Sequence, residues 1–301
     1  MKEKYNLILL ALSLVSLYIF FSNSLIAALL VTVLIIIGMD LSTDLIYETT
    51  DGLLRHKPGM LMGITLFAFI TSLDEIFVSG SSIVQGYDDI SIGTMMGSVS
   101  IGLVIFAILA LILRKRQRSL NASSMFVIPA FLLILIAAEY FSLSLDFKVA
   151  LAVVTVIITF ALIFYIGFAS DRGMETENKS EKKSGEVLIA ISVFILMALS
   201  FAMARVTDIF SVTLNVGGIA SGFILPGIIG TLPEFFAIKS SLSHRDRQSA
   251  NGILIGSTLI KGGMIFPILA IVFAYNPFES VDVTLATIIP TIVATIILVA
   301  Y

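Results

Sequence analysis

Two glutamates stand inside long apolar stretches of this chain, where an ionised carboxylate is costly. Glu75 follows the hydroxyl residues Thr71 and Ser72, and Glu234 follows Thr231. A charged group at the centre of a bilayer costs about 2.5–3.5 kcal/mol on insertion scales, and such groups usually mark an ion pathway. Carboxylate, hydroxyl and carbonyl oxygens are the ligands that Ca²⁺ prefers, six to eight of them at about 2.3–2.6 Å. The two glutamates therefore predict a cation or proton site inside the membrane.

The surroundings of the two glutamates repeat along the chain. Residues 63–75 (GITLFAFITSLDE) and 222–234 (GFILPGIIGTLPE) match at a constant offset of 159 residues, and the offset continues from 93–98 (GTMMGS) to 252–257 (GILIGS). Five predicted helices separate the copies, so we expect them to cross the membrane in opposite directions. Secondary transporters commonly bind substrate between such inverted repeats. The repeated glycines alone would also fit close helix packing.

Helix breakers distinguish the second copy from the first. Pro226 and Pro233 interrupt its apolar run and should leave backbone carbonyls free to face a cavity. The first copy has only the glycines Gly59, Gly63 and Gly80 as comparable breakers. The sequence thus predicts a broken helix for the second copy and leaves the first open.

The elements that must position these residues are membrane helices. The chain has 301 residues, 58% hydrophobic and 13% charged, with a mean hydropathy of +1.06, whereas a soluble domain carries about 25% charged residues. Apolar runs of about 20 residues can each span the bilayer. We expect one all-α integral membrane domain over residues 1–301, with about ten transmembrane helices at 5–22, 24–48, 59–85, 90–113, 122–142, 147–170, 187–210, 217–241, 248–275 and 281–300.

The basic residues lie on alternate connections between these helices. Fifteen of the 18 lysines and arginines do so, and the positive-inside rule assigns those connections to the cytoplasm. This distribution predicts a multi-pass cell-membrane protein with both termini in the cytoplasm. The polar, charged segment 171–186 is expected to be a cytoplasmic linker.

Composition also excludes several partners and cofactors. The net charge of −3 offers no basic surface for nucleic acid, and the absence of cysteine excludes disulfides and thiolate metal sites. With two histidines in the chain, a histidine-rich metal site is not expected either. The predicted partners are inorganic cations and the lipid bilayer, with no cofactor.

Residues 70–75 (ITSLDE) with 93–98, and 230–234 (GTLPE) with 252–257, resemble the two alpha-repeats of the cation/calcium exchanger superfamily. The sodium/calcium members of that superfamily carry a G-T-S-L-P-E-like signature followed by G-N-x-I-G-S. The resemblance covers about residues 24–275, with alpha-repeats at about 59–113 and 217–275. It implies two inverted five-helix repeats, an outer helix pair that slides over the core, and transport of Ca²⁺ with Na⁺ or H⁺ as counter-ion.

The same resemblance implies a set of ligands. Glu75 and Glu234 would be the central cation ligands. Further oxygens would come from the hydroxyls of Thr71, Ser72, Thr231, Ser98 and Ser257 and from the carbonyls of Ala68 and Gly227.

The chain departs from the superfamily pattern at several site positions. The replacements are Asp74 for proline, Gly230 for threonine, Thr94 and Ile253 for asparagines, and Gly102 and Lys261 for the polar residue four positions after each G-S serine. Lys261 falls on the helical face of Ser257, so its ammonium should lie near Glu234 in the place of a bound cation. Lys261 and Asp74 are therefore predicted to set coupling or selectivity, which favours proton coupling or altered selectivity over ordinary sodium exchange. The alternative is a lysine that snorkels to an interface or pairs as structural glue.

The helix order differs from the superfamily as well. Helix 5–22 precedes the first repeat, and the chain stops at Tyr301 after the ninth superfamily helix. We expect the additional helix to fill the vacant place in a permuted arrangement. Asp40, Asp44 and Glu48, spaced by four on one helix face, are expected to form an ion vestibule or to pair with Arg205.

These patterns predict a secondary active cation antiporter with alternating access, not an enzyme. A channel, or a transporter without exchange activity, is the alternative within transport. A membrane enzyme acting on lipid phosphates would need basic residues that clamp phosphate. Arg205 and Lys261 are the only intramembrane candidates, and neither belongs to a phosphate motif.

Overall fold

The computed structural model describes residues 8, 11–54, 68–114, 145–170, 185–243, 247–265, 267–268, 289 and 292–293. This part of the chain is helical and has no strand. Its elements are η1 (Leu17–Phe21), α2 (Leu25–Leu54), α4 (Ala68–Thr71), α5 (Leu73–Val84), α6 (Asp88–Arg114), α8 (Leu145–Ser170), α9 (Gly185–Leu214), α10 (Gly218–Ile229), α11 (Leu232–Ser243), α12 (Arg247–Ile260) and the π-turn η3 (Lys261–Ile265). Two predicted helices, 122–142 and 281–300, lie wholly or almost wholly outside the described residues. Residues 171–184 of the predicted linker also lie outside them, whereas residues 185–186 already belong to α9.

The long apolar runs form long helices, as expected. α2 and α9 have 30 residues each, and a helix of that length extends about 45 Å, more than a bilayer core. Among the described residues, three stretches are long and apolar enough to span a membrane: Leu25–Ser42, Ile189–Leu214 and Gly218–Lys239.

Both helices that carry the glutamates are broken. The segment expected as 217–241 divides into α10 and α11 around Gly230 and Thr231, and the segment expected as 59–85 is divided at Ser72 between α4 and α5. Ser72 and Thr231 are equivalent positions of the sequence repeat. The break left open for the first copy is therefore present at the same place as the break expected in the second.

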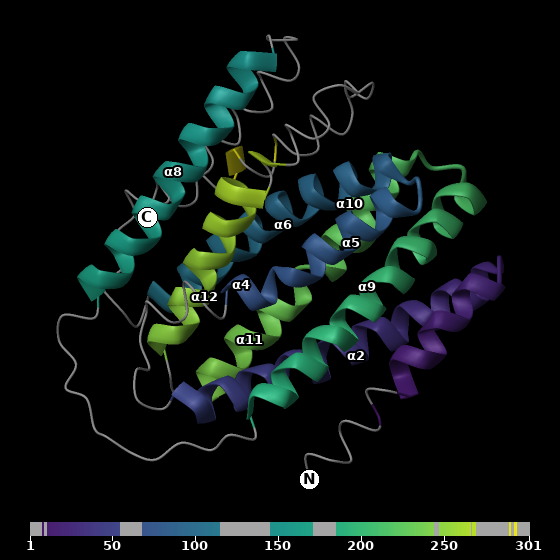
Figure 1. The fold of residues 1–301 in the computed structure, drawn as a ribbon, viewed down its shortest axis with the longest axis horizontal. Helices are drawn as coiled ribbons and strands as arrows, with labels where there is room; N and C mark the ends of the chain where they lie inside the picture. The colour runs from purple at the N-terminus through teal and green to yellow at the C-terminus, as the bar shows by residue number, and fades with distance from the viewer. Residues whose placement is uncertain are drawn as a thin grey trace.

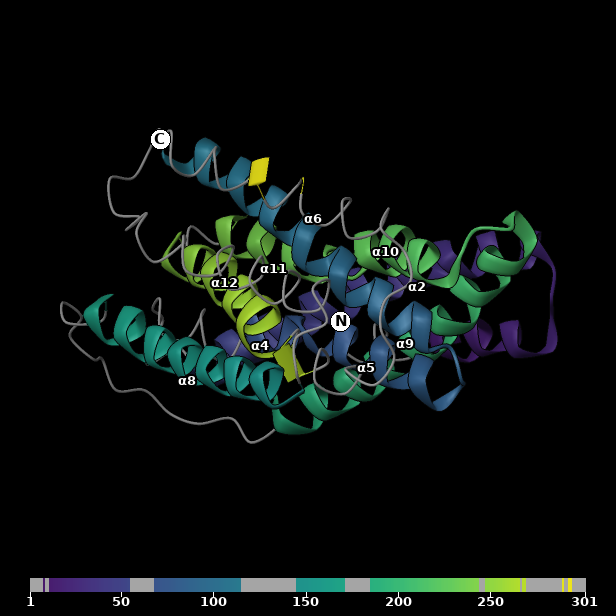
Figure 2. The ribbon, with the colours of Figure 1, turned by 90° about the horizontal axis from the view of Figure 1, so that it is seen from above.

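The two halves pack through corresponding pairs of helices. α2 lies beside α9; α5 packs on α9 and α11 on α2; α5 meets α6 and α11 meets α12; α10 packs on α6 and α4 on α12 (Figures 1 and 2). An apolar core between α2 and α9 includes the buried side chains of Ile35, Met39, Leu199 and Met203.

Glycines bring α6 and α10 into close approach. A β-carbon built on Gly97 would lie 2.4 Å from the Phe223 carbonyl oxygen and 3.0 Å from Gly227 Cα. A β-carbon on Gly222 would lie 2.4 Å from the Ile90 carbonyl oxygen. The Gly-x-x-x-Gly pattern of residues 93–97 thus serves helix packing, because backbone faces backbone at this crossing.

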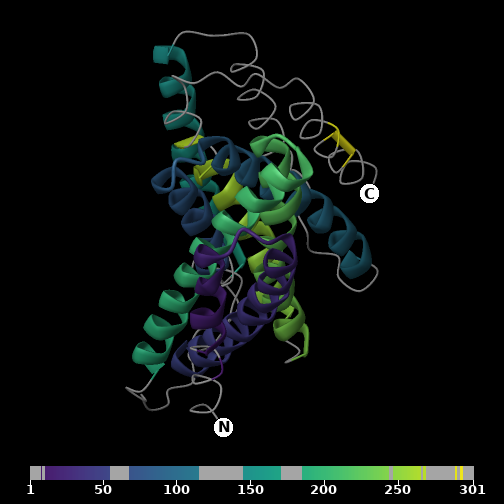
Figure 3. The same cartoon turned by 90° about the vertical axis from the view of Figure 1, so that its right-hand side faces the viewer.

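The N-terminal helix does not take the place expected from a permuted order. η1 packs against α9 and α2, away from α8 (Figure 3). α8 packs against η3 and α12 of the other half, so by the correspondence of the two halves a counterpart of α8 would lie against α6. The expectation that the additional helix fills that place is wrong for the described residues.

Candidate cation site

The two helix breaks place the glutamates at helix N-termini. Glu75 and Asp74 lie in the first turn of α5, and Glu234 lies in the first turn of α11. The first N–H groups of a helix lack intrahelical acceptors and carry the positive end of the helix dipole, which favours negative charge there. The breaks at Ser72 and Thr231 therefore create the electrostatic environment in which buried carboxylates are tolerated.

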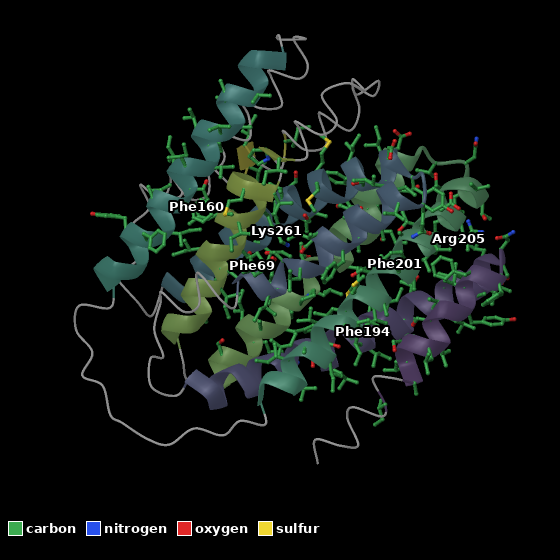
Figure 4. The ribbon with its side chains drawn as sticks, in the orientation of Figure 1. Phe69, Phe160, Phe194, Phe201, Arg205 and Lys261 are labelled. Carbon is green, nitrogen blue, oxygen red and sulfur yellow. The ribbon has the colours of Figure 1, made fainter. Side chains whose placement is uncertain are left out.

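One ammonium joins the two glutamates. Lys261 Nζ donates to Glu75 Oε1 and lies 2.6 Å from Glu234 Oε1. The exposed fractions of Glu75, Glu234 and Lys261 are 0%, 5% and 1%. Figure 4 shows Lys261 in the interior of the molecule. Lys261 therefore does not snorkel to an interface, and its positive charge takes the position between the carboxylates that the sequence predicted for it.

Local backbone structure directs Lys261 to this position. Lys261 opens η3 directly after α12 and follows Ser257 by four residues, so it keeps the helical face of Ser257. Gly263 allows the π-turn to approach α8, since a β-carbon there would lie 2.0 Å from Thr159 Oγ1. Single π-turns within helices are frequent at functional sites.

Gly230 makes room for Glu75, a role that sequence reasoning missed. A β-carbon on Gly230 would lie 3.1 Å from both Cγ and Oε1 of Glu75 and 2.8 Å from the Pro226 carbonyl oxygen. Gly230 is the counterpart of Thr71 in the repeat, but its contact with the glutamate of the other half depends on how the two halves pack. A larger residue there would press on the carboxylate of the other half.

The hydroxyls expected near the site bond to their own helices. Their hydrogen atoms go to carbonyls, which leaves oxygen lone pairs for another partner. The bonds run from Thr71 Oγ1 to Ala68 O (3.2 Å), Ser72 Oγ to Ala68 O (2.8 Å), Thr231 Oγ1 to Ile228 O (2.7 Å) and Ser98 Oγ to Met95 O (3.4 Å).

The two carbonyls expected as ligands differ in whether they still accept a helical hydrogen bond. The Ala68 carbonyl still accepts the Ser72 N–H at 3.1 Å. At the equivalent place, the Thr231 N–H donates to Ile228 O at 3.2 Å instead of the Gly227 carbonyl four residues back. The second break thus releases the Gly227 carbonyl from its helical donor, whereas the first break leaves Ala68 engaged.

Asp74 adds a third buried carboxylate to this cluster. It is 1% exposed, and neither carboxylate oxygen accepts a hydrogen bond from an N–H or O–H group of the described residues. Its charge interacts with those of Glu75, Glu234 and Lys261. Ser200 Oγ donates to its backbone carbonyl at 3.3 Å, which ties this turn of α5 to α9.

A row of further polar groups on α5 was also missed. Ser79 and Ser82 lie on α5 and Gln85 directly follows it, and Ser79 Oγ, Ser82 Oγ and Gln85 Nε2 are buried without a partner in the part of the chain that is described. Ser79 and Ser82 follow Glu75 by four and seven residues, a spacing that keeps them on one helical face. That spacing was the available signal in the sequence.

Arg205 belongs to a separate cluster. Its guanidinium donates to Asp208 Oδ2 (2.6 Å), Tyr87 Oη (2.9 Å) and Asn23 Oδ1 (2.6 Å). Asp40 is not among these partners, and the side chains of Asp44 and Glu48 lie outside the described residues, so the expected pairing stays a prediction for those two. Arg205 lies near one end of the molecule, away from Lys261 (Figure 4).

Two broken helices that present facing buried carboxylates define a class, the secondary transporters that bind ions where two halves of the protein meet. Within the described residues, no group of three or more acidic or histidine side chains is arranged to hold a metal ion, and the ammonium of Lys261 is the cation between the glutamates. The chain belongs to the sodium/calcium exchanger protein family, whose pattern matches residues 24–170 and 185–301. Members of this family are multi-pass membrane transporters and not enzymes, so an enzyme acting on lipid phosphates is excluded.

Solved structures show the same fold. Native YfkE is 15% identical with a TM-score of 0.65, covering 98% of this chain and 91% of that one. The H⁺/Ca²⁺ exchanger CAX is 16% identical with a TM-score of 0.63, covering 99% and 83%. The sodium-calcium exchanger NCX_Mj is 18% identical with a TM-score of 0.54, covering 97% and 91%. A comparison with curated proteins finds no match.

Proposed function

We propose that this family member is a secondary active antiporter that binds Ca²⁺ between Glu75 and Glu234 and exposes it alternately to the two sides of the membrane. The observation that carries the proposal is the meeting of two buried glutamates, from equivalent helix breaks, on one positively charged group. Two carboxylates neutralise one divalent cation, and the nearby hydroxyls retain lone pairs for it.

Lys261 sets the selectivity of this site. Its ammonium already contacts both carboxylates, so an arriving cation competes with a tethered one. A divalent cation has the advantage over Na⁺ in this competition, because it neutralises both glutamates while the ammonium carries a single charge. Release of the lysine proton as the cation arrives would link the exchange to H⁺, which is the alternative coupling.

Asp74 provides the position to which the ammonium moves. A charge left unpaired in the interior costs several kcal/mol, so the displaced ammonium needs another carboxylate. Asp74 is buried, has two oxygens without partners and already interacts with the charge of Lys261. Lys261 and Asp74 together are thus the residues that we assign to coupling or selectivity.

Alternating access is supported by the packing of the two long helices. α2 and α9 lie together, and each contacts a half-helix of the glutamate-bearing pair: α11 on α2 and α5 on α9. Movement of the α2–α9 pair along α5 and α11 would open the route to the site from one side of the membrane and close the route from the other side.

Uptake of radioactive calcium into proteoliposomes tests the proposal. Glu234→Gln should abolish uptake, whereas Asp88→Asn, which removes an exposed carboxylate at the start of α6, should not. Normal uptake by Glu234→Gln would show that the site is elsewhere. Uptake driven by a sodium gradient and indifferent to a pH gradient would exclude the proton-linked alternative.

A further inference from the structure

We infer that Lys261 is a built-in counter-cation for the unloaded site, so that the empty carrier can also cross the membrane and calcium can move down its gradient without a counter-ion, in addition to the proposed exchange. The inference rests on the proposed function. It concerns the step of the cycle in which no cation is bound.

The cost of an empty site is the first argument. Glu75 and Glu234 are 0% and 5% exposed, and two ionised carboxylates without a counter-charge are strongly unfavourable in such surroundings. A carrier with that site would pass through a closed state only when a cation is bound, which makes exchange obligatory. The contact of Lys261 with both carboxylates removes this barrier.

Attachment to the chain is the second argument. The ammonium belongs to the first residue of η3 and cannot diffuse into either compartment. It is therefore present on every return of the empty carrier, whichever side the carrier last faced.

The observed conformation supplies the third argument. The lysine comes from the end of α12, and its partners come from α5 and α11, one glutamate from each half. All three side chains are buried. The site is thus closed around the ammonium in the way that the proposed function requires it to close around a cation.

Cation loading is still possible with this arrangement. Asp74, with two unpartnered oxygens beside the cluster, receives the ammonium when calcium enters. The lysine then alternates between the two glutamates in the empty carrier and Asp74 in the loaded one.

The test measures calcium efflux from proteoliposomes loaded with radioactive calcium. The outer medium is choline thiocyanate with a chelator, in which the permeant anion balances charge, or the same medium with unlabelled calcium in place of the chelator. A pH dye inside the vesicles records any entry of protons. The variants are Lys261→Asp, Lys261→Met and the matched control Lys239→Met, which removes an exposed lysine of α11.

We expect the unsubstituted protein and Lys239→Met to release calcium into the chelator medium without acidifying the lumen. In Lys261→Asp the ratio of net efflux to calcium–calcium exchange should fall by at least about a hundredfold, the factor expected for buried charges left without a partner. If Lys261→Asp does not fold, as judged by gel filtration, Lys261→Met serves the same comparison.

Four results would overturn the inference. Exchange without net efflux in the unsubstituted protein would do so and leave the proposed function intact. Equal net efflux in the Lys261 variants, or efflux matched by proton entry, would also do so. Absence of both exchange and efflux would refute the proposed function, and the inference with it.

Discussion

Replacement of Lys261 by methionine removes the ammonium that joins the two glutamates and keeps a side chain of similar length. Glu75 and Glu234, whose exposed fractions are 0% and 5%, then lose the ammonium that contacts both carboxylates. Removing one partner of a buried ion pair costs about 3–5 kcal/mol, because the other charge stays buried. We expect the free energy of unfolding in calcium-free buffer to fall by about this amount, which lowers the folding equilibrium constant by a factor of roughly 10²–10³·⁵.

Calcium should reverse this loss in the variant. A ligand at about a hundred times its dissociation constant stabilises a protein by about 2.7 kcal/mol. In Lys261→Met the cation meets two unopposed carboxylates, whereas in the unsubstituted protein it must first displace the ammonium. Calcium should therefore stabilise the variant more than the unsubstituted protein.

Unfolding of the purified protein in detergent at pH 8, with chelator or with calcium, provides the measurement. Lys239→Met is the control, since Lys239 is exposed on α11 and lies 5.9 Å from the ring centroid of Phe236. If Lys261→Met and Lys239→Met were equally stable in chelator, and calcium affected them equally, the ammonium would not be neutralising the two glutamates.

Three further substitutions, one of them with a matched control, test the helix packing and the two charged clusters. Gly97→Ala should destabilise by about 1–3 kcal/mol, since the added carbon meets backbone of α10, whereas Gly102→Ala on the same helix meets nothing within 4 Å and should unfold at the original temperature. Asp74→Asn should weaken the apparent calcium affinity in flux assays about tenfold, a typical coupling between two binding events; an unchanged affinity would remove Asp74 from the displacement step. Arg205→Met should cost about 1–2 kcal/mol in thermal unfolding through its lost hydrogen bonds and leave calcium affinity unchanged.

The break in the first copy shows what the sequence could not reveal. In the second copy Pro233 lacks the N–H group that a continuous helix needs, so the break beside it was predictable from that residue, whereas Pro226 lies inside α10 and does not end it. The first copy has no proline at its break, and Ser72 instead directs its hydroxyl to the Ala68 carbonyl. A serine hydroxyl that bonds to its own helix interrupts the helix in some proteins and leaves it continuous in others. The serine alone therefore did not predict a break, and only its equivalence to Thr231 in the repeat indicated this position.

Contacts between distant segments were the other limit. The direction of Lys261 could be predicted, because it depends on four residues of helix after Ser257. The partners of Arg205 come from the start of α2 and from the connection between α5 and α6, and helical spacing contains no information on which helix ends meet. The room that Gly230 leaves for Glu75 likewise depends on how two halves of the chain pack.

The two charged departures from the repeat are opposite in sign, and this leads to a last prediction. Asp74 stands where the second half has Pro233, and Lys261 stands where the first half has Gly102. Together they add no net charge, so Glu75 and Glu234 still leave a formal −2 for a divalent cation to neutralise. If Asp74 and Lys261 act as one unit, Asp74→Asn should weaken calcium affinity in the unsubstituted protein and have a much smaller effect in Lys261→Met, because no ammonium then needs a place to which it can move. Calcium affinities of the four proteins, measured in the same flux assay, give the interaction energy. Strict additivity would mean that the aspartate never receives the ammonium.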